Sequence, residues 1–280
     1  MLVKKKIKFS KMHGLENDFI ILDNTKNDIF LKPEIIRYLS NRYTGIGFDQ
    51  LLLIERSKMK NIDFHYRIFN ANGLEVFQCG NGARCLAVFL SLNNYTKKKV
   101  IYVSTKNRII VLNLLQDGNI CVDMGVPNFN PKYIPYLNTI SKEYYSIFIL
   151  KKLIKYSVVS MGNPHCVIIT NNVKQYPVKK IGSILSTHKL FPNGVNVIFM
   201  EIISEKYIVL RVYERGVGET RSCGSGACAA VAIGIKNNML SNKVTVELLG
   251  GKLTINWNGN LNKLYMIGSA THVYNGYFYI

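Results

Sequence analysis

The segment Cys-Gly-x-Gly-Ala occurs twice in this 280-residue chain, at residues 79–83 and again at residues 223–227. Each copy follows a segment in which apolar and polar residues alternate, as in a half-buried strand, and each precedes an apolar run typical of a buried helix. The order strand, polar turn, Cys-Gly motif and helix is therefore present twice. Because self-similarity at a fixed spacing indicates a duplicated unit, the repeat predicts two homologous α/β halves related by a pseudo-twofold axis.

Polar residues outside the motif recur in the same order in both halves. The aligned pairs are Asn17 with Asn163, Gln50 with Asn196, Arg67 with Arg211, Asn70 with Glu214 and Glu75 with Glu219. A duplication that served only to build a core would keep apolar positions and lose polar ones. The recurrence of polar residues therefore favours a functional site at the interface between the halves.

The composition narrows the function classes. Hydrophobic residues make up 48% of the chain, which suffices for a full core, and no apolar run reaches the ~18 residues of a membrane span. Residues 1–14 carry charge but no apolar stretch, so we expect no secretory signal, a cytoplasmic location and six reduced cysteines. The net charge of +19 comes from scattered lysines, without a basic stripe or a nucleic-acid motif, so we expect no nucleic-acid partner and no membrane partner.

The two motifs fit neither a zinc site nor a nucleotide-binding loop. Five residues separate Cys79 from Cys85, and four separate Cys223 from Cys228. Structural zinc sites usually have two to four residues between the ligands of a pair, and a second pair with a matching spacing. Neither motif continues into the Lys-Ser or Lys-Thr of a Walker loop, and we expect no metal. The other cysteines lie in apolar runs and are interpreted as buried small hydrophobes: Cys85, Cys121, Cys166 and Cys228.

A thiol at the start of a helix has a distinct chemistry. The helix dipole and the free amide N–H groups there stabilise a thiolate and lower the cysteine pKa from about 8.5. Two such thiols on opposite faces of one carbon would form a two-base racemase or epimerase, in which one removes a proton and the other delivers one. No lysine lies in a recognisable pyridoxal phosphate setting, so we expect no cofactor; glycine amides would instead stabilise the substrate carboxylate as charge develops.

The ionisable neighbours of the two motifs differ. His165 aligns with Phe19 and Glu214 aligns with Asn70, so both ionisable groups come from the second half. Unequal neighbours separate the pKa values of two thiols, which predicts one thiol and one thiolate.

Longer stretches around these residues resemble the diaminopimelate epimerase family. The matching segments are KMHGLENDF (11–19), GIGFDQLL (45–52), FHYRIFNANG (64–73), QCGNGAR (78–84), SMGNPHC (160–166), RVYERGVGETRSCGSGACA (211–229) and ATHVY (270–274). The resemblance covers essentially the whole chain. It implies a cofactor-independent homodimer that interconverts LL- and meso-2,6-diaminopimelate on the bacterial route to lysine and peptidoglycan.

The resemblance also implies a division of the chain and a set of site residues. Each half would be a β-barrel-like sheet around a central helix, with the active site in the cleft between residues 1–123 plus 269–280 and residues 124–268. Cys79 and Cys223 would be the acid/base thiols, His165 and Glu214 would adjust their pKa values, and Tyr274 would lie at the dimer interface. The substrate-binding residues would be Asn17, Gln50, Asn70, Gly80, Asn81, Asn163, Asn196, Glu214, Arg215, Gly224 and Ser225, of which Asn70, Asn163, Asn196 and Arg215 would bind the distal end.

Two positions depart from the family pattern. Glu16 stands where the family usually has glycine, and a positive φ there would cost about 1 kcal/mol. Phe77 is bulkier than expected beside Gln78. Two other functions remain as alternatives, a proline-racemase-like or phenazine-biosynthesis-like isomerase of the same fold and a thiol redox or anion-binding module. The distal asparagines and Arg215 favour a two-ended substrate.

Overall fold

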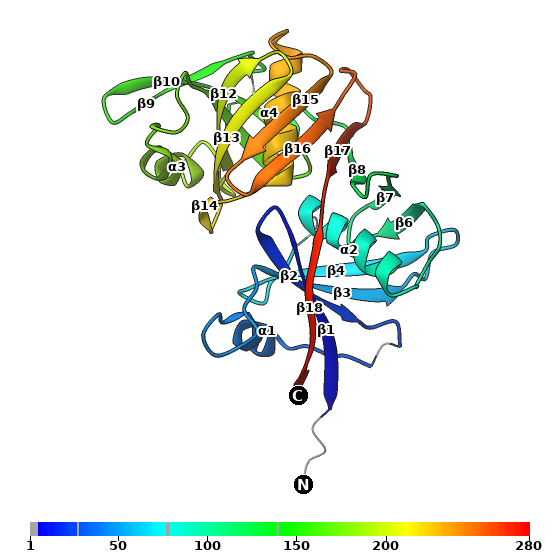
Figure 1. The fold of residues 1–280 in the computed structure, drawn as a ribbon. Coiled ribbons are helices and arrows are strands. Elements are labelled where there is room, and N and C mark those ends of the chain that lie inside the picture. Colours follow the sequence, from blue (N-terminus) through cyan, green and yellow to red (C-terminus); the bar gives the residue numbers. More distant parts are fainter. Residues whose placement is uncertain (1–4, 27, 77–78, 139) are drawn as a thin grey trace. The chain divides into compact units, whose positions relative to one another are not determined.

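The computed structural model describes residues 5–26, 28–76, 79–138 and 140–280. Phe77 and Gln78, one of the two departures and its neighbour, lie outside these residues. Contacts within the chain divide it into two units, Met1–Val122 with Gly268–Ile280 and Asp123–Ile267 (Figure 1).

The first unit is a mixed sheet whose strands run in the order β18–β1–β2–β3–β4–β6–β7–β8, with β5 paired to β4. Two helices belong to it, α1 (Pro33–Ser40) and α2 (Gly80–Leu92). The strands are β1 (Lys6–Gly14), β2 (Asn17–Asp23), β3 (Gln50–Arg56), β4 (Phe64–Asn70), β5 (Glu75–Val76), β6 (Val100–Ser104), β7 (Ile109–Leu114), β8 (Ile120–Gly125) and β18 (Thr271–Tyr279).

The second unit repeats this arrangement. Its strands run in the order β9–β10–β11–β12–β13–β15–β16–β17, with β14 paired to β13. Its helices are α3 (Val178–Ser186), α4 (Gly224–Lys236) and the 3-10 turn η1 (Pro131–Tyr133). The strands are β9 (Tyr145–Ile149), β10 (Lys152–Ser160), β11 (Pro164–Ile169), β12 (Asn196–Ser204), β13 (Tyr207–Glu214), β14 (Gly218–Thr220), β15 (Lys243–Leu248), β16 (Gly251–Asn256) and β17 (Leu264–Gly268).

The strand directions match between the units as well as the strand order. The pairs β2–β3 and β4–β6 are parallel, and so are their counterparts β11–β12 and β13–β15, whereas the pairs between and after them are antiparallel in both units. The same spatial strand order and the same pattern of parallel and antiparallel pairs in both units confirm the predicted α/β class with two internally related units.

The central helix of each unit is buried on nearly all sides. Every residue of α4 from Gly226 to Gly234 is buried, and in α2 even Asn81 and Arg84 are. The second glycine of each motif makes this packing possible: a Cβ on Gly82 would lie 3.2 Å from Leu52 and from Phe19, and one on Gly226 would lie 3.3 Å from Ile198. The glycine therefore suits the close approach of helix to sheet, because a Cβ there would press on the facing side chains.

The other face of each sheet carries its own core. In the first unit α1 buries Ile36 and Leu39 against residues of β2 and β3 such as Ile20 and Leu51. In the second unit α3 does the same with Ile181 and Leu185. Burial on both faces holds these strands rigidly, which is what the residues at their ends require to keep a defined position.

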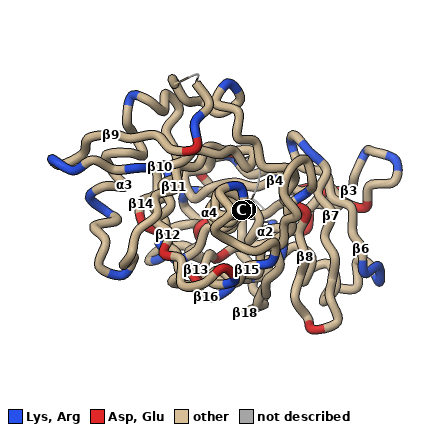
Figure 2. The backbone as a smooth tube through the Cα atoms, turned by 90° about the horizontal axis from the view of Figure 1, so that it is seen from above, with Lys and Arg blue, Asp and Glu red and all other residues tan. Residues whose placement is uncertain are grey.

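The basic residues are distributed over both units. Lys and Arg are spread along loops and strands of both units (Figure 2). Among the helices of the described residues, none combines the length and the apolar character needed to cross a membrane.

The hairpin between β1 and β2 contains the Glu16 departure. Gly14 pairs directly with Asn17, so Leu15 and Glu16 form a two-residue loop, and their φ values are 56° and 63°. A loop with positive φ at both positions favours Asn-Gly, because a residue with a Cβ is strained there. In the second unit the residue before Asn163 is Gly162, with φ 94°.

We predict that Glu16→Gly raises the free energy of unfolding by about 0.5–1 kcal/mol, because relief of the left-handed strain exceeds the extra chain entropy that glycine adds to the unfolded state. Urea unfolding of the variant measures this. Glu16→Ala is the control and should leave the midpoint nearly unchanged, since alanine keeps the Cβ. A glycine variant no more stable than the alanine variant would contradict the prediction.

Candidate active site

Cys79 occupies the N-cap of α2, as the motif predicted. Its backbone is extended (φ −146°, ψ 111°), and its Sγ accepts a hydrogen bond from the Gly82 N–H at 3.4 Å. The sulfur therefore lies at the first turn of a buried helix, where unpaired amide N–H groups and the positive end of the helix dipole stabilise negative charge.

Asn17 lies beside this thiol. Its Oδ1 is 3.7 Å from Cys79 Sγ and 3.3 Å from Asn81 Nδ2, and its own Nδ2 donates to Asp49 Oδ2 at 3.1 Å. Asn17 is the first residue of β2 and directly follows the strained loop, so the backbone conformation at Glu16 affects the position of the Asn17 side-chain amide. The structure thus brings three predicted site residues, Asn17, Cys79 and Asn81, into contact.

Gln50 and Asn70 form a second pair in the first unit. Gln50 is the first residue of β3, Asn70 is the last of β4, and the two are direct cross-strand partners whose side chains share a hydrogen bond of 2.8 Å from Nε2 to Oδ1. Gln50 is also the strand partner of Phe19, whose ring lies against α2, so both amides are on the helix side of the sheet. Among the described residues, Gln50 Oε1 is buried without a hydrogen-bond donor.

Cys223 occupies the N-cap of α4 in the same extended conformation (φ −137°, ψ 105°). Its Sγ lies 3.1 Å from Glu214 Oε2 and 3.6 Å from Ser225 Oγ. The other carboxylate oxygen, Glu214 Oε1, accepts a hydrogen bond from the Thr220 hydroxyl at 2.6 Å. Because a carboxylate only accepts, the thiol donates its S–H to Glu214.

The pKa of Cys223 lies well above that of a free thiol. Burial is the largest cause, and the charge of Glu214 and its hydrogen bond to the thiol add to it. Ser225 and the Gly226 amide act in the opposite direction but do not compensate. Cys223 is therefore a protonated thiol at neutral pH.

His165 is buried behind Asn163. Burial and the nearby charge of Arg215 lower the pKa of His165 to about 3, so the ring is neutral at physiological pH. Its Nε2 lies 3.0 Å from Asn163 Oδ1, which accepts, so the proton is on Nε2. Within the described part of the chain, the partner of His165 is Asn163 and not Cys223, and its Nδ1 is buried without a partner.

Asn196 and Arg215 lie at the same end of the second sheet. Asn196, the first residue of β12, is the strand partner of His165, and its Oδ1 accepts the backbone N–H of Arg215 at 2.9 Å. The Arg215 guanidinium donates through Nη1 to the Asn193 carbonyl. Asn163, His165, Asn196 and Arg215 thus form one group at the ends of neighbouring strands.

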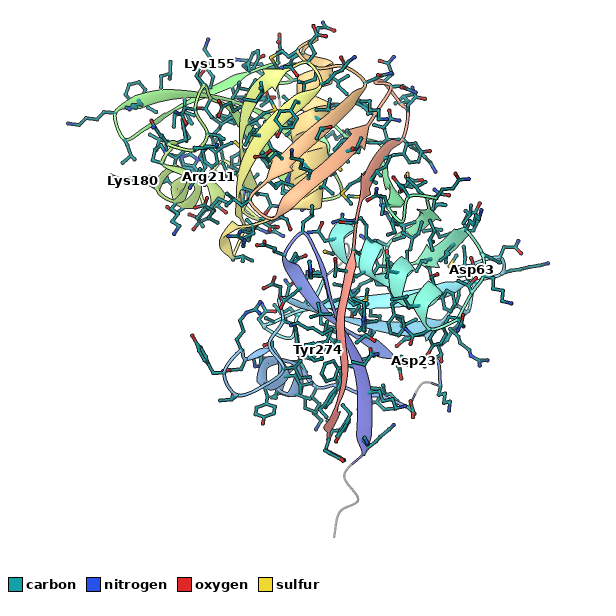
Figure 3. All side chains as sticks on the ribbon, in the orientation of Figure 1. Asp23, Asp63, Lys155, Lys180, Arg211 and Tyr274 are labelled. Carbon is teal, nitrogen blue, oxygen red and sulfur yellow. The ribbon has the colours of Figure 1, made fainter. Side chains whose placement is uncertain are left out.

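The sequence missed some residues that the structure places at these sites. Thr220 and Asp49 hold Glu214 and Asn17 respectively, and no sequence signal marked them apart from their place next to recognised motifs. Arg67 and Arg211 were seen to recur but were given no role. Arg67 binds both oxygens of Glu75 at 3.0 Å, and Arg211 (Figure 3) binds Glu219 at 2.7 Å, so each ion pair ties together the hairpin that leads to a cysteine.

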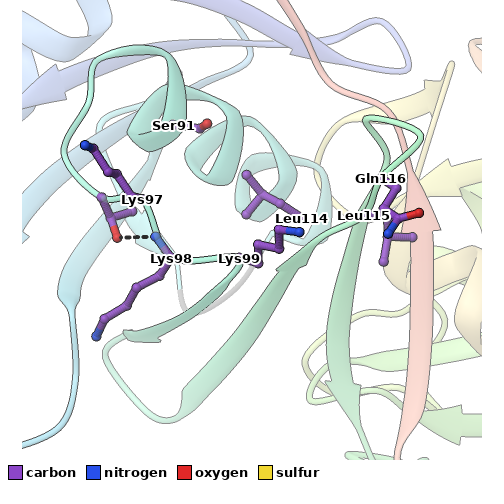
Figure 4. A pocket seen from close by; sticks show the side chains of 8 residues that line it. Ser91, Lys97, Lys98, Lys99, Leu114, Leu115 and Gln116 are labelled. Atoms are coloured by element: carbon purple, nitrogen blue, oxygen red, sulfur yellow. Dashed lines mark hydrogen bonds between the residues drawn. The ribbon is translucent and has the colours of Figure 1, made fainter.

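A surface pocket of the first unit lies at the opposite end of α2 from Cys79. It is lined by Ser91, Thr96, Lys97, Lys98, Lys99, Leu114, Leu115 and Gln116 (Figure 4). Ser91 is in the last turn of α2, about 17 Å along the helix from its start at Gly80. None of the predicted site residues lines this pocket, and we assign no function to it. Within the described residues no group of three His, Cys, Asp or Glu is arranged to hold a metal ion.

The sequence model of the diaminopimelate epimerase family matches residues 9–130 and 157–273. The chain belongs to the diaminopimelate epimerase family. A diaminopimelate epimerase of Buchnera aphidicola subsp. Baizongia pistaciae (strain Bp) is 62% identical over 276 residues, which cover 98% of this chain and 96% of the relative. One from Buchnera aphidicola subsp. Acyrthosiphon pisum (strain APS) is 54% identical over 277 residues, covering 99% and 98%. The resemblance found in the sequence is confirmed, and diaminopimelate epimerases are enzymes of the isomerase class.

Solved structures share the fold at low sequence identity. A hydroxyproline epimerase from Agrobacterium vitis with bound trans-4-hydroxy-L-proline has a TM-score of 0.76 at 12% identity, covering 100% of this chain and 94% of that one. A phenazine biosynthesis protein of the PhzF family from Bacillus anthracis has a TM-score of 0.68 at 15% identity, covering 99% and 100%. At such identities these structures show the fold that this chain shares with them.

We predict that Glu214→Gln lowers the pKa of Cys223 and speeds its alkylation by iodoacetamide at pH 8 about three- to tenfold, because the carboxylate charge and acceptor are lost. Mass spectrometry with fragmentation separates Cys223 from Cys228 on the same tryptic peptide. Ser225→Ala is the matched control and should slow alkylation, since Ser225 acts in the opposite direction. An unchanged Cys223 rate in Glu214→Gln would show that the carboxylate does not control this thiol.

Proposed function

We propose that this protein interconverts LL- and meso-2,6-diaminopimelate without a cofactor, with the thiols of Cys79 and Cys223 as its two bases. The observation that carries the proposal is that a member of the diaminopimelate epimerase family places one thiol at the N-cap of each of two equivalent buried helices. Inversion at a carbon by two bases needs a group on each face, and two equivalent units each supply one.

The proposed step moves one proton on and one proton off the same α-carbon. One cysteine thiolate takes the α-proton as the C–H electron pair passes into the carboxylate, and the opposite S–H then protonates the other face of the carbon. The enzyme ends with the thiol and thiolate exchanged. Backbone N–H groups of Gly80 and Asn81 and of Gly224 and Ser225, at the first turns of α2 and α4, would stabilise the carboxylate as negative charge develops on it.

The state of Cys223 fits one direction of this reaction. Its thiol is protonated and donates to Glu214, so in this state Cys223 is the acid and Cys79 is the base. The Thr220 hydroxyl would donate a hydrogen bond to Glu214 whether Cys223 is a thiol or a thiolate. Glu214 opposes loss of the Cys223 proton to solvent, so the proton stays on the sulfur until it is transferred to the substrate carbanion. Glu214 therefore adjusts the thiol directly, whereas His165 would do so only through the position of Asn163.

The side-chain amides favour a ligand with a distal amino-acid group. The Oδ1 atoms of Asn163 and Asn196 are both engaged by the protein, so each offers an NH₂ group that suits a carboxylate. Arg215 adds a cation at the same place. In the first unit the Oε1 of Gln50, beside Asn70, offers a buried acceptor that suits an ammonium group. Donors for a carboxylate and acceptors for an ammonium are what a two-ended diamino acid requires.

We predict that Cys79→Ser and Cys223→Ser each reduce interconversion of LL- and meso-diaminopimelate by at least about a thousandfold, because a serine hydroxyl is a far weaker acid and base than a thiol at neutral pH. Chromatographic separation of the isomers measures the conversion. Cys121→Ser is the control, since Cys121 lies on β8 in neither motif, and it should retain activity. Full turnover by either motif variant would exclude the two-base mechanism.

The homodimer and the cytoplasmic location belong to the same proposal. In the described sheet of the first unit the strand neighbour of β18 is β1, and β18 exposes Val273, Tyr274, Tyr277 and Tyr279. Tyr274 packs edge-on against Phe9, with ring centroids 5.9 Å apart (Figure 3). A long edge strand with exposed aromatic residues suits pairing with a second copy of this chain.

We predict that Tyr274→Ala weakens the homodimer, because it removes an aromatic side chain from the middle of the pairing strand. Sedimentation velocity across protein concentrations measures the dimer dissociation constant, which should rise about tenfold or more. Tyr43→Ala is the control. Tyr43 is exposed in the loop after α1, distant from β18 in the sequence, and its loss should leave the dimer dissociation constant unchanged. A dissociation constant that is the same in both variants would remove Tyr274 from the interface.

A further inference from the structure

The Asn17 amide contacts Cys79 through its oxygen and the Asp49 carboxylate through its NH₂ group. Asp49, the residue directly before β3, accepts the Asn17 Nδ2–H at 3.1 Å and the backbone N–H of Asp18 at 3.2 Å through the same oxygen, Oδ2. Its other oxygen, Oδ1, accepts from Arg42 Nη2 at 2.8 Å. All these contacts lie within the first unit, and none of them reaches the sulfur of Cys79 directly.

A network of charged side chains holds these groups in place. Arg42 also donates to both oxygens of Asp18, at 2.8 and 3.0 Å, and Lys11 donates to Asp18 Oδ2 at 2.7 Å. Burial opposes ionisation of Asp18, but the hydrogen bonds and charges of Arg42 and Lys11 outweigh it and lower its pKa to about 2. Asp49 shares the Arg42 guanidinium with Asp18, and its backbone N–H donates to Asp18 Oδ1 at 2.8 Å.

Both oxygens of Asp49 accept hydrogen bonds, Oδ2 from the Asp18 N–H and Oδ1 from Arg42, so the group of Asn17 that faces Asp49 is its NH₂. The carbonyl oxygen is then forced to the opposite side, toward Cys79 Sγ and Asn81 Nδ2. We propose that Asp49 is a positioning residue that keeps the Asn17 amide with its oxygen toward the Cys79 thiol. The inference depends on the proposed function only for the role of Cys79 as a base.

The orientation matters because the two ends of an amide have opposite effects on a thiol. A carbonyl oxygen accepts from S–H and favours the neutral thiol, whereas an NH₂ group donates to S⁻ and favours the thiolate. With the oxygen held toward it, Cys79 retains a proton acceptor beside its S–H in the half-reaction where it must act as the acid. Glu214 provides the acceptor for Cys223, so each thiol has an oxygen at its side.

Other titratable groups near Cys79 do not supply this effect. Tyr66 on β4 and Cys85 on α2 interact with Cys79 electrostatically, but burial raises the pKa of each, so both are neutral. Around Asn17 the charges of Asp18, Asp49, Arg42 and Lys11 form the network described above. The further cations Arg84 and Arg108 act on Cys85 and Tyr66 respectively. In the second unit the position of Asp49 is taken by Val195, and Asn163 is held instead through its oxygen by His165.

The test is the pKa of Cys79, read from the pH dependence of its alkylation by iodoacetamide. Trypsin releases Cys79 on residues 68–84, a peptide with no other cysteine, so mass spectrometry follows this thiol in the intact enzyme. Asp49→Asn keeps the shape of the side chain but lets Asn17 rotate, and it should lower the pKa of Cys79 by about half to one unit. If Asp49→Asn unfolds below the assay temperature, Asp49→Ser replaces it. The serine hydroxyl both donates and accepts, so the same shift in the pKa of Cys79 is expected.

A double-mutant cycle separates positioning from a simple loss of charge. In an Asn17→Ala background, Asp49→Asn should shift the pKa of Cys79 by less than about 0.2 units, because the amide through which Asp49 acts is gone. An equal shift in both backgrounds, or no shift in either, would overturn the proposal. Arg42→Gln is the charge control: it keeps the Asp49 carboxylate and therefore the amide orientation, and it should not lower the pKa. Because the readout is a thiol and not turnover, loss of epimerase activity does not affect the result.

Discussion

The rest of the structure depends on the attachment of a thiol to the first turn of a helix that is buried on nearly all sides. Because α2 and α4 are enclosed by their sheets, the N-cap residue of each helix has a fixed position. In both helices that residue is a cysteine. The glycine three residues later lets the helix approach the sheet so closely that a Cβ there would press on Phe19 and Leu52 or on Ile198. Packing, not loop flexibility, therefore determines where the sulfur lies.

The two units use the same frame with different neighbours for the sulfur. Cys79 has the carbonyl oxygen of Asn17 beside it, and Cys223 has the carboxylate of Glu214. An amide oxygen is neutral, whereas a carboxylate adds charge, and the charge contributes to the raised pKa of Cys223. The duplicated fold thus places the two thiols at equivalent positions, and Glu214, which stands where the first unit has Asn70, helps to raise the pKa of Cys223.

Much of this was accessible from the sequence because it depends on local patterns. The strand, turn, Cys-Gly motif and helix were predicted from periodicity and from the repeat, and the helices do begin at Gly80 and Gly224. The alternation expected before the second motif is present in β13, where Ile208, Leu210 and Val212 are buried. The sequence also indicated backbone strain at Glu16, because the family usually has glycine there. Its φ of 63° is the left-handed conformation that causes such strain.

What the sequence did not reveal depends on contacts between residues that are distant in the chain. Nothing local indicates that Asp49 holds Asn17, because the contact arises only when β2 and β3 lie in parallel register. The neutral state of His165 follows from its complete burial and from Arg215, fifty residues later, which a sequence pattern does not place beside it. The use of the Asn163 and Asn196 oxygens by the protein is likewise a property of the folded sheet.

The most direct test of the account is the origin of the new α-hydrogen. The reduced enzyme is incubated with LL-diaminopimelate in D₂O, and both isomers are isolated at early times for mass spectrometry. Two bases on opposite faces predict one deuterium on the inverted carbon of the meso product and almost none in the recovered LL substrate. Deuterium entering the recovered substrate as fast as the meso product forms would contradict the account, because it would mean that a single base removes and returns the proton on one face.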